Sequence, residues 1–228
     1  MNDAIVQSLE IVTLLGAASV PDVVFDESLA LAPCLVAADG GAARALARGR
    51  MPEAVIGDFD SLSDEVRAQI PAERLHRVTE QECTDFDKAI RGIVAPLILA
   101  VGFTGQRLDH ELAVYNALVR NGDRRVIVVG EHDICFHLPA PLRLELPLGS
   151  RVSLFPMARV GCDSTGLEWP TDGLDFCPWG RVGTSNRSVS EVVDLWPEGP
   201  GMLLILPRAQ LRAAMRALVD GSAPVRDR

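Results

Sequence analysis

The sequence predicts an α/β N-terminal domain with a mostly parallel, Rossmann-like sheet, followed by an all-β C-terminal sandwich domain. Up to about residue 130, short apolar segments alternate with amphipathic ones, which is typical of a parallel sheet covered by helices on both faces. Beyond about residue 140, short β-type segments are separated by Pro, Gly and Asp, as in antiparallel sandwiches and barrels. Pro139-Ala140-Pro141 is the expected linker, so the predicted domains are 1–138 and 142–228.

Short apolar runs predict the strands of the first domain. Such runs are found at 9–16, 34–38, 54–57, 75–78, 97–101 and 125–130. Four helices are expected between them, at 42–48, 63–70, 84–93 and 108–120. Ser63 and Thr84 stand where hydroxyl caps are favoured, because a side-chain oxygen there accepts a free backbone N–H. In the last helix, apolar residues at 108, 112, 115 and 119 lie on one face.

The second domain has weaker signals. Strands are expected at 142–146, 151–155, 189–193 and 202–206, and a short helix at 209–219. Residues 221–228 are expected to fray, as chain ends commonly do.

Composition restricts the classes of partner. The net charge of −9 argues against nucleic acid and anionic membranes. No apolar run reaches membrane-spanning length, and the first residues lack the basic start of a signal peptide. The five cysteines have no metal-ligand spacing, which favours reduced thiols in a cytoplasm. We therefore expect a cytoplasmic protein without membrane or nucleic-acid partners.

Asp58 and Asp60 follow the apolar run at 54–57, and Gly57 opens the turn. In an extended chain, both carboxylates lie on one side, about 7 Å apart, while Phe59 points to the core. Such carboxylates repel each other unless a cation lies between them, and Mg²⁺ prefers hard oxygen ligands of this kind. A simple turn is the commoner explanation of this motif taken alone.

Three more polar motifs also lie near strand ends, where open α/β sheets bind ligands. They are Asp39-Gly40-Gly41, Thr84-Asp85-Phe86-Asp87-Lys88 and the segment from Gly102 to His110. Paired glycines before a helix let backbone N–H groups approach an anion, and an arginine fork suits phosphate oxygens. Each motif singly has a commoner structural explanation: a tight turn, an exposed ion pair or a helix-dipole effect. Their occurrence in series predicts a phosphate site.

Lys88 is the single lysine among the 22 basic residues. Its place inside a polar cluster is either chance or a requirement for a compact ammonium, because Lys and Arg are not interchangeable at a phosphate.

In order and spacing, these four motifs resemble those of the thiamin pyrophosphokinase (thiamine diphosphokinase) family. In the second half, Ser164-Thr165-Gly166-Leu167-Glu168-Trp169 and Gly183-Thr184-Ser185-Asn186 resemble the thiamine-side motifs of that family. The resemblance extends from about Val12 to Leu206. It implies a homodimer with active sites between subunits, and transfer of the pyrophosphoryl group of ATP to thiamine, which gives thiamine diphosphate and AMP.

The resemblance also implies roles for particular residues. Mg²⁺ is expected on Asp58, Asp60 and Asp85, with Glu82 and Asp109 as further candidates. Catalytic roles are expected for Asp58, Asp60, Asp85, Arg107 and Asp109. ATP contacts are expected from Asp39, Gly40, Gly41, Thr84, Lys88, Thr104, Gly105, Arg107 and His110. Thiamine contacts are expected from Trp169, Ser185 and Asn186; taken alone, Trp169 is nearly as well explained as a core residue. The motifs do not identify a general base. Phosphoryl transfer depends mainly on positioning and charge neutralisation.

The chain departs from the family pattern at two places. Ala43 stands where an Asn is common, and Glu80-Gln81-Glu82 replaces an Asp-Gln-Asp stretch. Three other functions remain open: pyrophosphoryl transfer to another alcohol such as a hydroxymethylpterin, a non-catalytic nucleotide or thiamine-diphosphate sensor, and a metal-dependent phosphohydrolase. The sensor needs no acidic cluster, and the phosphohydrolase needs no acceptor.

Overall fold

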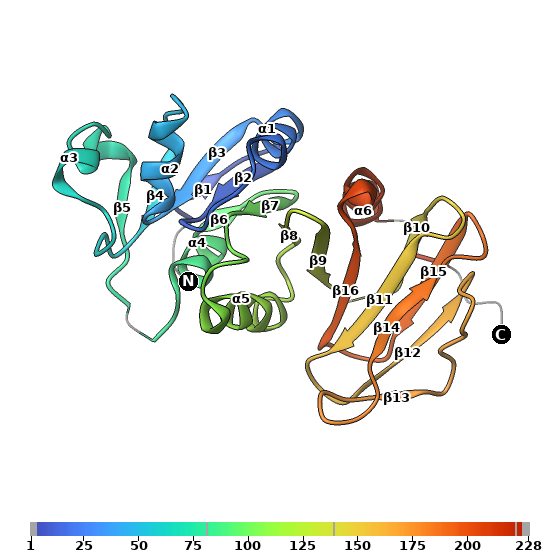
Figure 1. The fold of residues 1–228 in the computed structure, drawn as a ribbon. Helices are drawn as coiled ribbons and strands as arrows, with labels where there is room; N and C mark the ends of the chain where they lie inside the picture. Colours follow the sequence, from blue (N-terminus) through green and yellow to red (C-terminus); the bar gives the residue numbers. More distant parts are fainter. Residues whose placement is uncertain (1–3, 81, 139, 222, 225–228) are drawn as a thin grey trace. The chain divides into compact units, whose positions relative to one another are not determined.

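The computed structural model describes residues 4–80, 82–138, 140–221 and 223–224. The chain forms two compact units (Figure 1). The first contains the residues up to Ala117 together with Val126–Glu131, and the second contains Leu118–Arg125 and the residues from His132 onward. Along the chain the last change from the first unit to the second follows Glu131, while Pro139 of the predicted linker lies outside the described residues and the predicted domain bounds stay a prediction.

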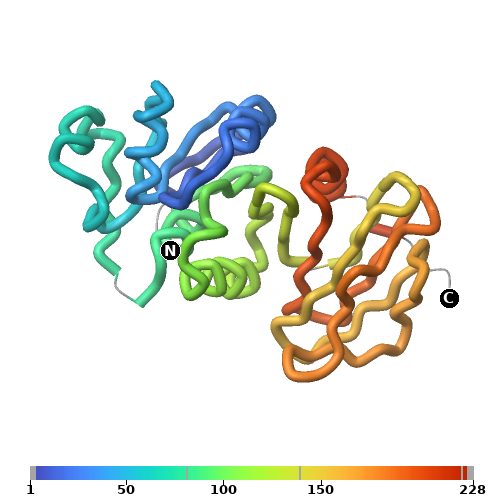
Figure 2. Tube along the Cα trace, in the orientation of Figure 1, coloured from blue at the N-terminus to red at the C-terminus, as the bar shows by residue number. Residues whose placement is uncertain are grey.

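Six parallel strands form the sheet of the first unit, in the order β8-β7-β2-β3-β4-β5. The strands are β2 (Val12–Leu15), β3 (Cys34–Ala38), β4 (Ala54–Gly57), β5 (Leu75–Arg77), β7 (Ile98–Val101) and β8 (Val126–Val129). Every residue of β2, β4, β7 and β8 is buried, as expected for a parallel sheet covered on both faces. The tube in Figure 2 shows the blue β2 beside the green β7, far from it in sequence.

The helices of this unit are α1 (Asp22–Leu31), α2 (Gly41–Ala47), α3 (Asp64–Arg67), α4 (Asp85–Gly92) and α5 (Leu108–Arg120). A short 3-10 turn, Ala72–Arg74, precedes β5, and β1 (Val6–Gln7) pairs with β6 (Ile93–Val94). Figure 1 shows α1 and α2 on the opposite face of the sheet from α4 and α5. This arrangement follows from right-handed crossovers, because the chain runs outward from β2 through β3 to β5 and then returns to β7 on the other side.

The expected caps are present. Ser63 Oγ accepts a hydrogen bond from Val66 N, and Thr84 Oγ1 accepts one from Asp87 N. The apolar face predicted for α5 is not the face that the helix buries. Leu108 and Leu112 are 70% and 56% exposed, whereas the buried residues of this helix are Val114, Ala117 and Leu118. Helix α1 was not predicted.

Antiparallel strands make up most of the second unit. One set has the order β14-β11-β16-β9 and the other β10-β15-β12-β13. The strands are β9 (Asp133–His137), β10 (Leu142–Glu145), β11 (Arg151–Pro156), β12 (Val160–Thr165), β13 (Asp175–Phe176), β14 (Gly183–Arg187), β15 (Val192–Pro197) and β16 (Met202–Pro207). A 3-10 turn (Arg208–Gln210) leads into α6 (Leu211–Asp220). Burial alternates along β10 and β12, so each of these strands packs by one face.

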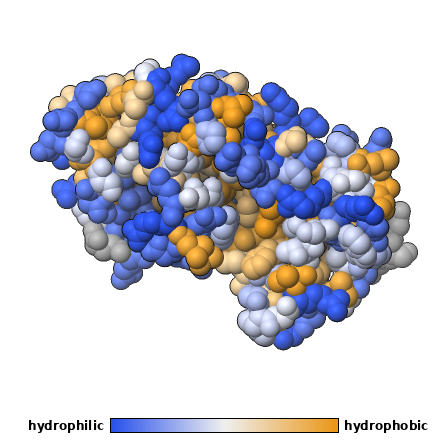
Figure 3. Space-filling model, in the orientation of Figure 1, coloured by the Kyte–Doolittle hydropathy of each residue, from blue (hydrophilic) through white to orange (hydrophobic). Residues whose placement is uncertain are grey.

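The molecular face in Figure 3 is largely hydrophilic, with smaller apolar areas. Among the described residues, no helix has the length and apolarity needed to cross a bilayer.

Candidate active site

A cavity of about 640 Å³ lies in the first unit, at the carboxyl ends of its central strands. Residues that follow β2, β3, β4 and β7 line it, together with the start of α4 and part of α5. The chain leaves β2 toward β3 on one side and returns through β7 on the other, so the cavity lies where the strand order reverses. The lining residues are Ala17, Ala18, Ala38, Asp39, Gly40, Asp58, Ser61, Glu82, Cys83, Thr84, Asp85, Phe86, Lys88, Gly102, Phe103, Gln106, Arg107, His110 and Val114.

Asp39 follows β3 and is only 2% exposed. Its Oδ2 accepts a hydrogen bond from Ser61 N (3.3 Å), whereas its buried Oδ1 has no hydrogen-bond partner. Burial, reinforced by the negative charge of Asp85, raises the pKa of Asp39 to about 6. Gly57 allows this placement, because a Cβ there would lie 2.8 Å from the Asp39 Cβ. A buried carboxylate oxygen that has no hydrogen-bond partner can act as a ligand for a cation.

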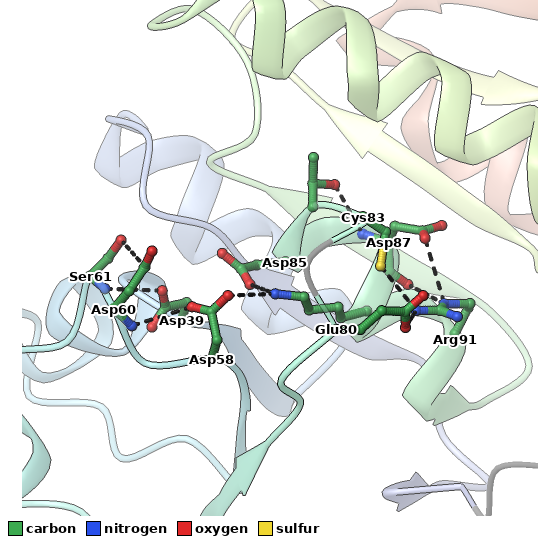
Figure 4. Close-up of polar contacts among 11 residues, drawn as sticks. Asp39, Asp58, Asp60, Ser61, Glu80, Cys83, Asp85, Asp87 and Arg91 are labelled. Carbon is green, nitrogen blue, oxygen red and sulfur yellow. Dashed lines mark hydrogen bonds and ion pairs between the residues drawn. The ribbon is translucent and has the colours of Figure 1, made fainter.

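Asp58 and Asp60 converge through a turn rather than an extended chain. Phe59 has a φ of 69°, and Asp60 N donates to Asp58 Oδ1 (3.3 Å). Phe59 still packs against the core, on a cluster of buried residues that includes Val55 and Leu62, as predicted. One carboxylate oxygen from each of Asp39, Asp58 and Asp60 lies within 4.8 Å of the other two (Figure 4). We call these three residues the carboxylate triad.

Asp85 lies beside the carboxylate triad and is bridged to it by Lys88. Lys88 Nζ lies 2.7 Å from Asp58 Oδ2 and 3.0 Å from Asp85 Oδ1. Burial disfavours the ammonium, but the hydrogen bonds to both carboxylates outweigh it and raise the Lys88 pKa. The hydrogen bond from Lys88 lowers the Asp58 pKa, whereas burial raises that of Asp85. Lys88 therefore stays charged and holds the start of α4 against the turn that follows β4.

Arg91, which the sequence reasoning missed, joins the segment before α4 to this helix. Its guanidinium donates to Glu80 Oε2 and to Cys83 Sγ (3.1 Å), and it pairs with Asp87 at 3.5 Å (Figure 4). Burial raises the pKa of the Cys83 thiol to about 11, so this cavity-lining residue is not a thiolate. The spacing of four between Asp87 and Arg91 on one helix was the available signal. Gln81 lies outside the described residues.

The segment after β7 has backbone geometry that suits glycine. Gly102 and Gly105 have φ values of 75° and 86°. Arg107 lines the cavity and pairs with Asp109 at 2.6 Å, with both side chains 66% exposed. This pairing lowers the Asp109 pKa and raises that of Arg107. His110 also lines the cavity, whereas Thr104, Gly105 and Asp109 are not among the lining residues.

Gly41 has a packing role. A Cβ on Gly41 would overlap the carbonyl oxygen of Leu15, so only glycine lets α2 lie this close to the end of β2. Gly40 lines the cavity, and Gly41 does not. Apolar members of the lining that the sequence did not indicate include Ala17, Phe86 and Phe103. The two phenylalanine rings meet edge to face at 4.8 Å.

Trp169, Ser185 and Asn186 come together in the second unit. The Trp169 side chain is 55% exposed, so it is not a core residue. Asn186 is buried and hydrogen-bonds both the N–H and the carbonyl of Trp169 (3.2 and 2.7 Å). Ser185 has a φ of 63°, and its N–H donates to Ser153 Oγ (3.0 Å). An exposed aromatic ring on a tightly held backbone suits a flat ligand.

One family model matches most of the first unit. The family model described as "Thiamin pyrophosphokinase, catalytic domain" matches residues 25–129, which include the carboxylate triad, Asp85, Lys88, Arg107 and His110. Residues 25–129 of the chain match the thiamin pyrophosphokinase family.

Curated thiamine pyrophosphokinases of plants align with part of the chain. Thiamine pyrophosphokinase 1 of Oryza sativa subsp. japonica is 28% identical over 161 residues, which cover 62% of this chain and 61% of the rice protein. Thiamine pyrophosphokinase 2 of Arabidopsis thaliana is 27% identical over the same length, with 62% and 60% covered. The match thus spans about three fifths of each of these relatives.

Solved structures of thiamin pyrophosphokinases share the fold over most of the chain. The Geobacillus thermodenitrificans protein superposes with a TM-score of 0.69 at 24% identity and covers 86% of this chain and 96% of its own. The Candida albicans protein gives a TM-score of 0.71 at 18% identity, with 89% and 92% covered. At these identities the likeness establishes the fold.

Proposed function

We propose that the protein is a thiamine diphosphokinase, which transfers the pyrophosphoryl group of ATP to thiamine and releases AMP. The observation that carries the proposal is the carboxylate triad beside Lys88, in a cavity at the carboxyl ends of the central strands. In this reaction the hydroxyl oxygen of thiamine attacks the β-phosphorus of ATP, the bond from that phosphorus to the α,β-bridging oxygen breaks, AMP leaves with that oxygen, and the hydroxyl proton passes to water. The names of the plant relatives support the same activity.

The residues present fit a divalent cation. Asp39 offers a buried oxygen without a hydrogen-bond partner, and all three donors of the triad are hard oxygens, as Mg²⁺ prefers. We assign Asp39, Asp58 and Asp60 to the cation, with Asp85 joining them when Lys88 turns toward phosphate. The cation would offset charge on the polyphosphate and on the transferred group. Asp39, expected from the sequence to contact ATP, is thereby proposed as a metal ligand.

The remaining residues of the cavity would orient ATP. Arg107 presents an exposed fork for phosphate oxygens. Lys88 can exchange one of its two carboxylate partners for a phosphate oxygen while its charge stays fixed. Thr84 fixes the first turn of α4 and so the position of Asp85. None of these groups needs to remove a proton, because positioning and electrostatic stabilisation provide most of the catalysis in phosphoryl transfer.

We propose that the second unit binds the acceptor. Trp169 offers an exposed ring to the flat, cationic thiamine. Ser185 is exposed and directly precedes Asn186, whose side chain hydrogen-bonds the Trp169 backbone. The family resemblance supports a Rossmann-like first domain, a β-sandwich second domain and a homodimer in which both kinds of residue serve one site.

One assay tests the function and separates it from the alternatives. The protein is incubated with ATP, Mg²⁺ and either thiamine or a hydroxymethylpterin, and AMP, ADP and phosphate are measured. AMP formed only with thiamine supports the proposal. AMP formed only with the pterin indicates a different acceptor, phosphate without an acceptor indicates a phosphohydrolase, and binding without turnover indicates a sensor.

A further inference from the structure

The side-chain amide of Asn186 forms hydrogen bonds with backbone groups of the second unit. Its Oδ1 accepts hydrogen bonds from Trp169 N (3.2 Å) and Arg187 N (2.9 Å), and its Nδ2 donates to Trp169 O (2.7 Å). An amide oxygen has two acceptor positions, and both are used. The residue is 7% exposed. This side chain is therefore committed to the segment that carries Trp169.

A β-bulge aims Asn186 at that segment. In the pairing of β11 with β14, Val152 lies opposite Asn186 and Leu154 opposite Gly183, so two residues of β14 face Ser153 alone. One of them, Ser185, has a φ of 63° and is held by the buried Ser153 hydroxyl at 3.0 Å. A bulge of this kind redirects the following side chain. Asn186 is buried, while Ser185 and Arg187 on either side are exposed.

Other contacts hold the neighbouring residues, but among the described residues no second side chain is seen to hydrogen-bond the N–H or carbonyl of Trp169. Leu167 pairs with Ser188 across the two segments, and Glu168 N donates to Arg187 O (2.9 Å). Beyond Trp169, Thr171 Oγ1 donates to Cys162 O (2.5 Å). Asn186 is thus the side chain that fixes the peptide groups of Trp169 itself, while the indole stays 55% exposed.

We propose that Asn186 is a positioning residue, which acts on the acceptor only through Trp169 and does not contact the acceptor itself. This inference rests on the proposed function for its link to thiamine. It replaces the sequence-based expectation that Asn186 binds thiamine directly. It predicts that the effects of changing Asn186 and Trp169 are not additive, because one acts through the other.

The test is a double-mutant cycle on the full chain with Asn186→Ala, Trp169→Ala and the double variant. KM for thiamine is measured at saturating ATP and Mg²⁺. We expect Trp169→Ala and Asn186→Ala each to raise KM about tenfold, and the double variant to match Trp169→Ala within about twofold. Val189→Ala, at an exposed position beyond the end of β14, is the control and should leave KM unchanged. A double variant equal to the product of the single effects would show that Asn186 acts independently of Trp169 and would overturn the proposal.

A second measurement needs no substrate. The quenching of Trp169 fluorescence by acrylamide is measured in two backgrounds. With Asn186 present, it is the difference between the wild type and Trp169→Ala. Without Asn186, it is the difference between Asn186→Ala and the double variant Asn186→Ala/Trp169→Ala. We expect faster quenching when Asn186 is absent, and unchanged quenching would overturn the proposal. Asn186→Asp, which keeps the size but loses the bond to Trp169 O, replaces Asn186→Ala if that variant does not fold. Faster quenching in a protein that makes no AMP with thiamine would support the positioning role and refute the proposed function alone.

Discussion

Asp58 is bound by Lys88 at the same time as it faces the other carboxylates of the triad. Lys88 Nζ lies 2.7 Å from Asp58 Oδ2, and the two side chains are 2% and 14% exposed. Asp60, on the other side of Phe59, is exposed and hydrogen-bonds Ser61 Oγ (3.0 Å). The two aspartates of one motif therefore have different consequences for stability.

We expect Asp60→Asn to lower activity by orders of magnitude and to leave the melting temperature close to that of the wild type. Its charge is repelled by its neighbours when no cation is bound, so removing it does not harm the fold. Asp58→Asn should lower activity equally but also reduce stability, because it deprives a buried ammonium of one of its two partners. Thermal melts and AMP assays of both variants check this. Retained activity in Asp60→Asn would restore the explanation of the motif as a simple turn.

The raised pKa of Asp39 makes the metal-free fold sensitive to pH. Its folded pKa of about 6 exceeds the ordinary value of 3.8, so the folded state holds a proton there more tightly than the unfolded state. The resulting stabilisation is complete below about pH 4 and is lost as the pH rises through about 6. Asp39→Asn removes this dependence.

We therefore expect Asp39→Asn without metal to melt above the wild type at about pH 7.5, with the difference shrinking toward about pH 4. Mg²⁺ should raise the melting temperature of the wild type and not that of the variant. Melting curves across this pH range, with and without Mg²⁺, provide the check. A variant less stable than the wild type at every pH contradicts the account of Asp39.

Lys88→Arg should not behave as a conservative change. The Lys88 side chain is buried and holds Asp58 and Asp85 through a single nitrogen, so a broad planar guanidinium does not fit. We expect kcat to fall at least about tenfold, or roughly 1.4 kcal/mol in the barrier. Arg50→Lys, at an exposed position, is the control. Unchanged kinetics in Lys88→Arg would mean that the single lysine of the chain is an accident of composition.

The homodimer proposed from the family resemblance can be tested by mixing two inactive chains. In a mixed dimer of Asp58→Asn and Trp169→Ala chains, one of the two sites carries neither change. Part of the wild-type activity should therefore return when the chains are refolded together and verified as mixed dimers. Full activity in a species that sizes as a monomer at micromolar concentration argues against a shared site, as does absence of rescue in verified mixed dimers.

Much of the first unit could be predicted, because local signals there agree with the fold. The bounds of β3, β4 and α5 match the apolar runs and helical spacing. The buried face of α5 was not predictable from spacing alone, because Leu108 and Leu112 satisfy the period yet are exposed. In the second unit, β14 has the sequence Gly-Thr-Ser-Asn-Arg, which contains no apolar residue, so no alternation marks it as a strand. It lies at the edge of its sheet among the described strands.

In the candidate site, too, local sequence patterns predicted some features and long-range packing determines the others. The meeting of Asp58 and Asp60 was expected, but it arises from a positive φ at Phe59 that no local pattern indicates. Asp39 joins them because β3 and β4 are neighbours in the sheet, a long-range relationship. The bonds from Asn186 to Trp169 likewise connect residues far apart in sequence, through a bulge that the residue types did not predict.

The most direct test of the central claim is the nucleotide product formed from ATP. With Mg²⁺ and thiamine together, we predict AMP in equal amount to thiamine diphosphate, and no AMP when either thiamine or the divalent cation is withheld. Asp60→Asn should abolish this product while remaining folded. ADP as the main product, or AMP formed equally well without thiamine, would contradict the assignment of this cavity to pyrophosphoryl transfer.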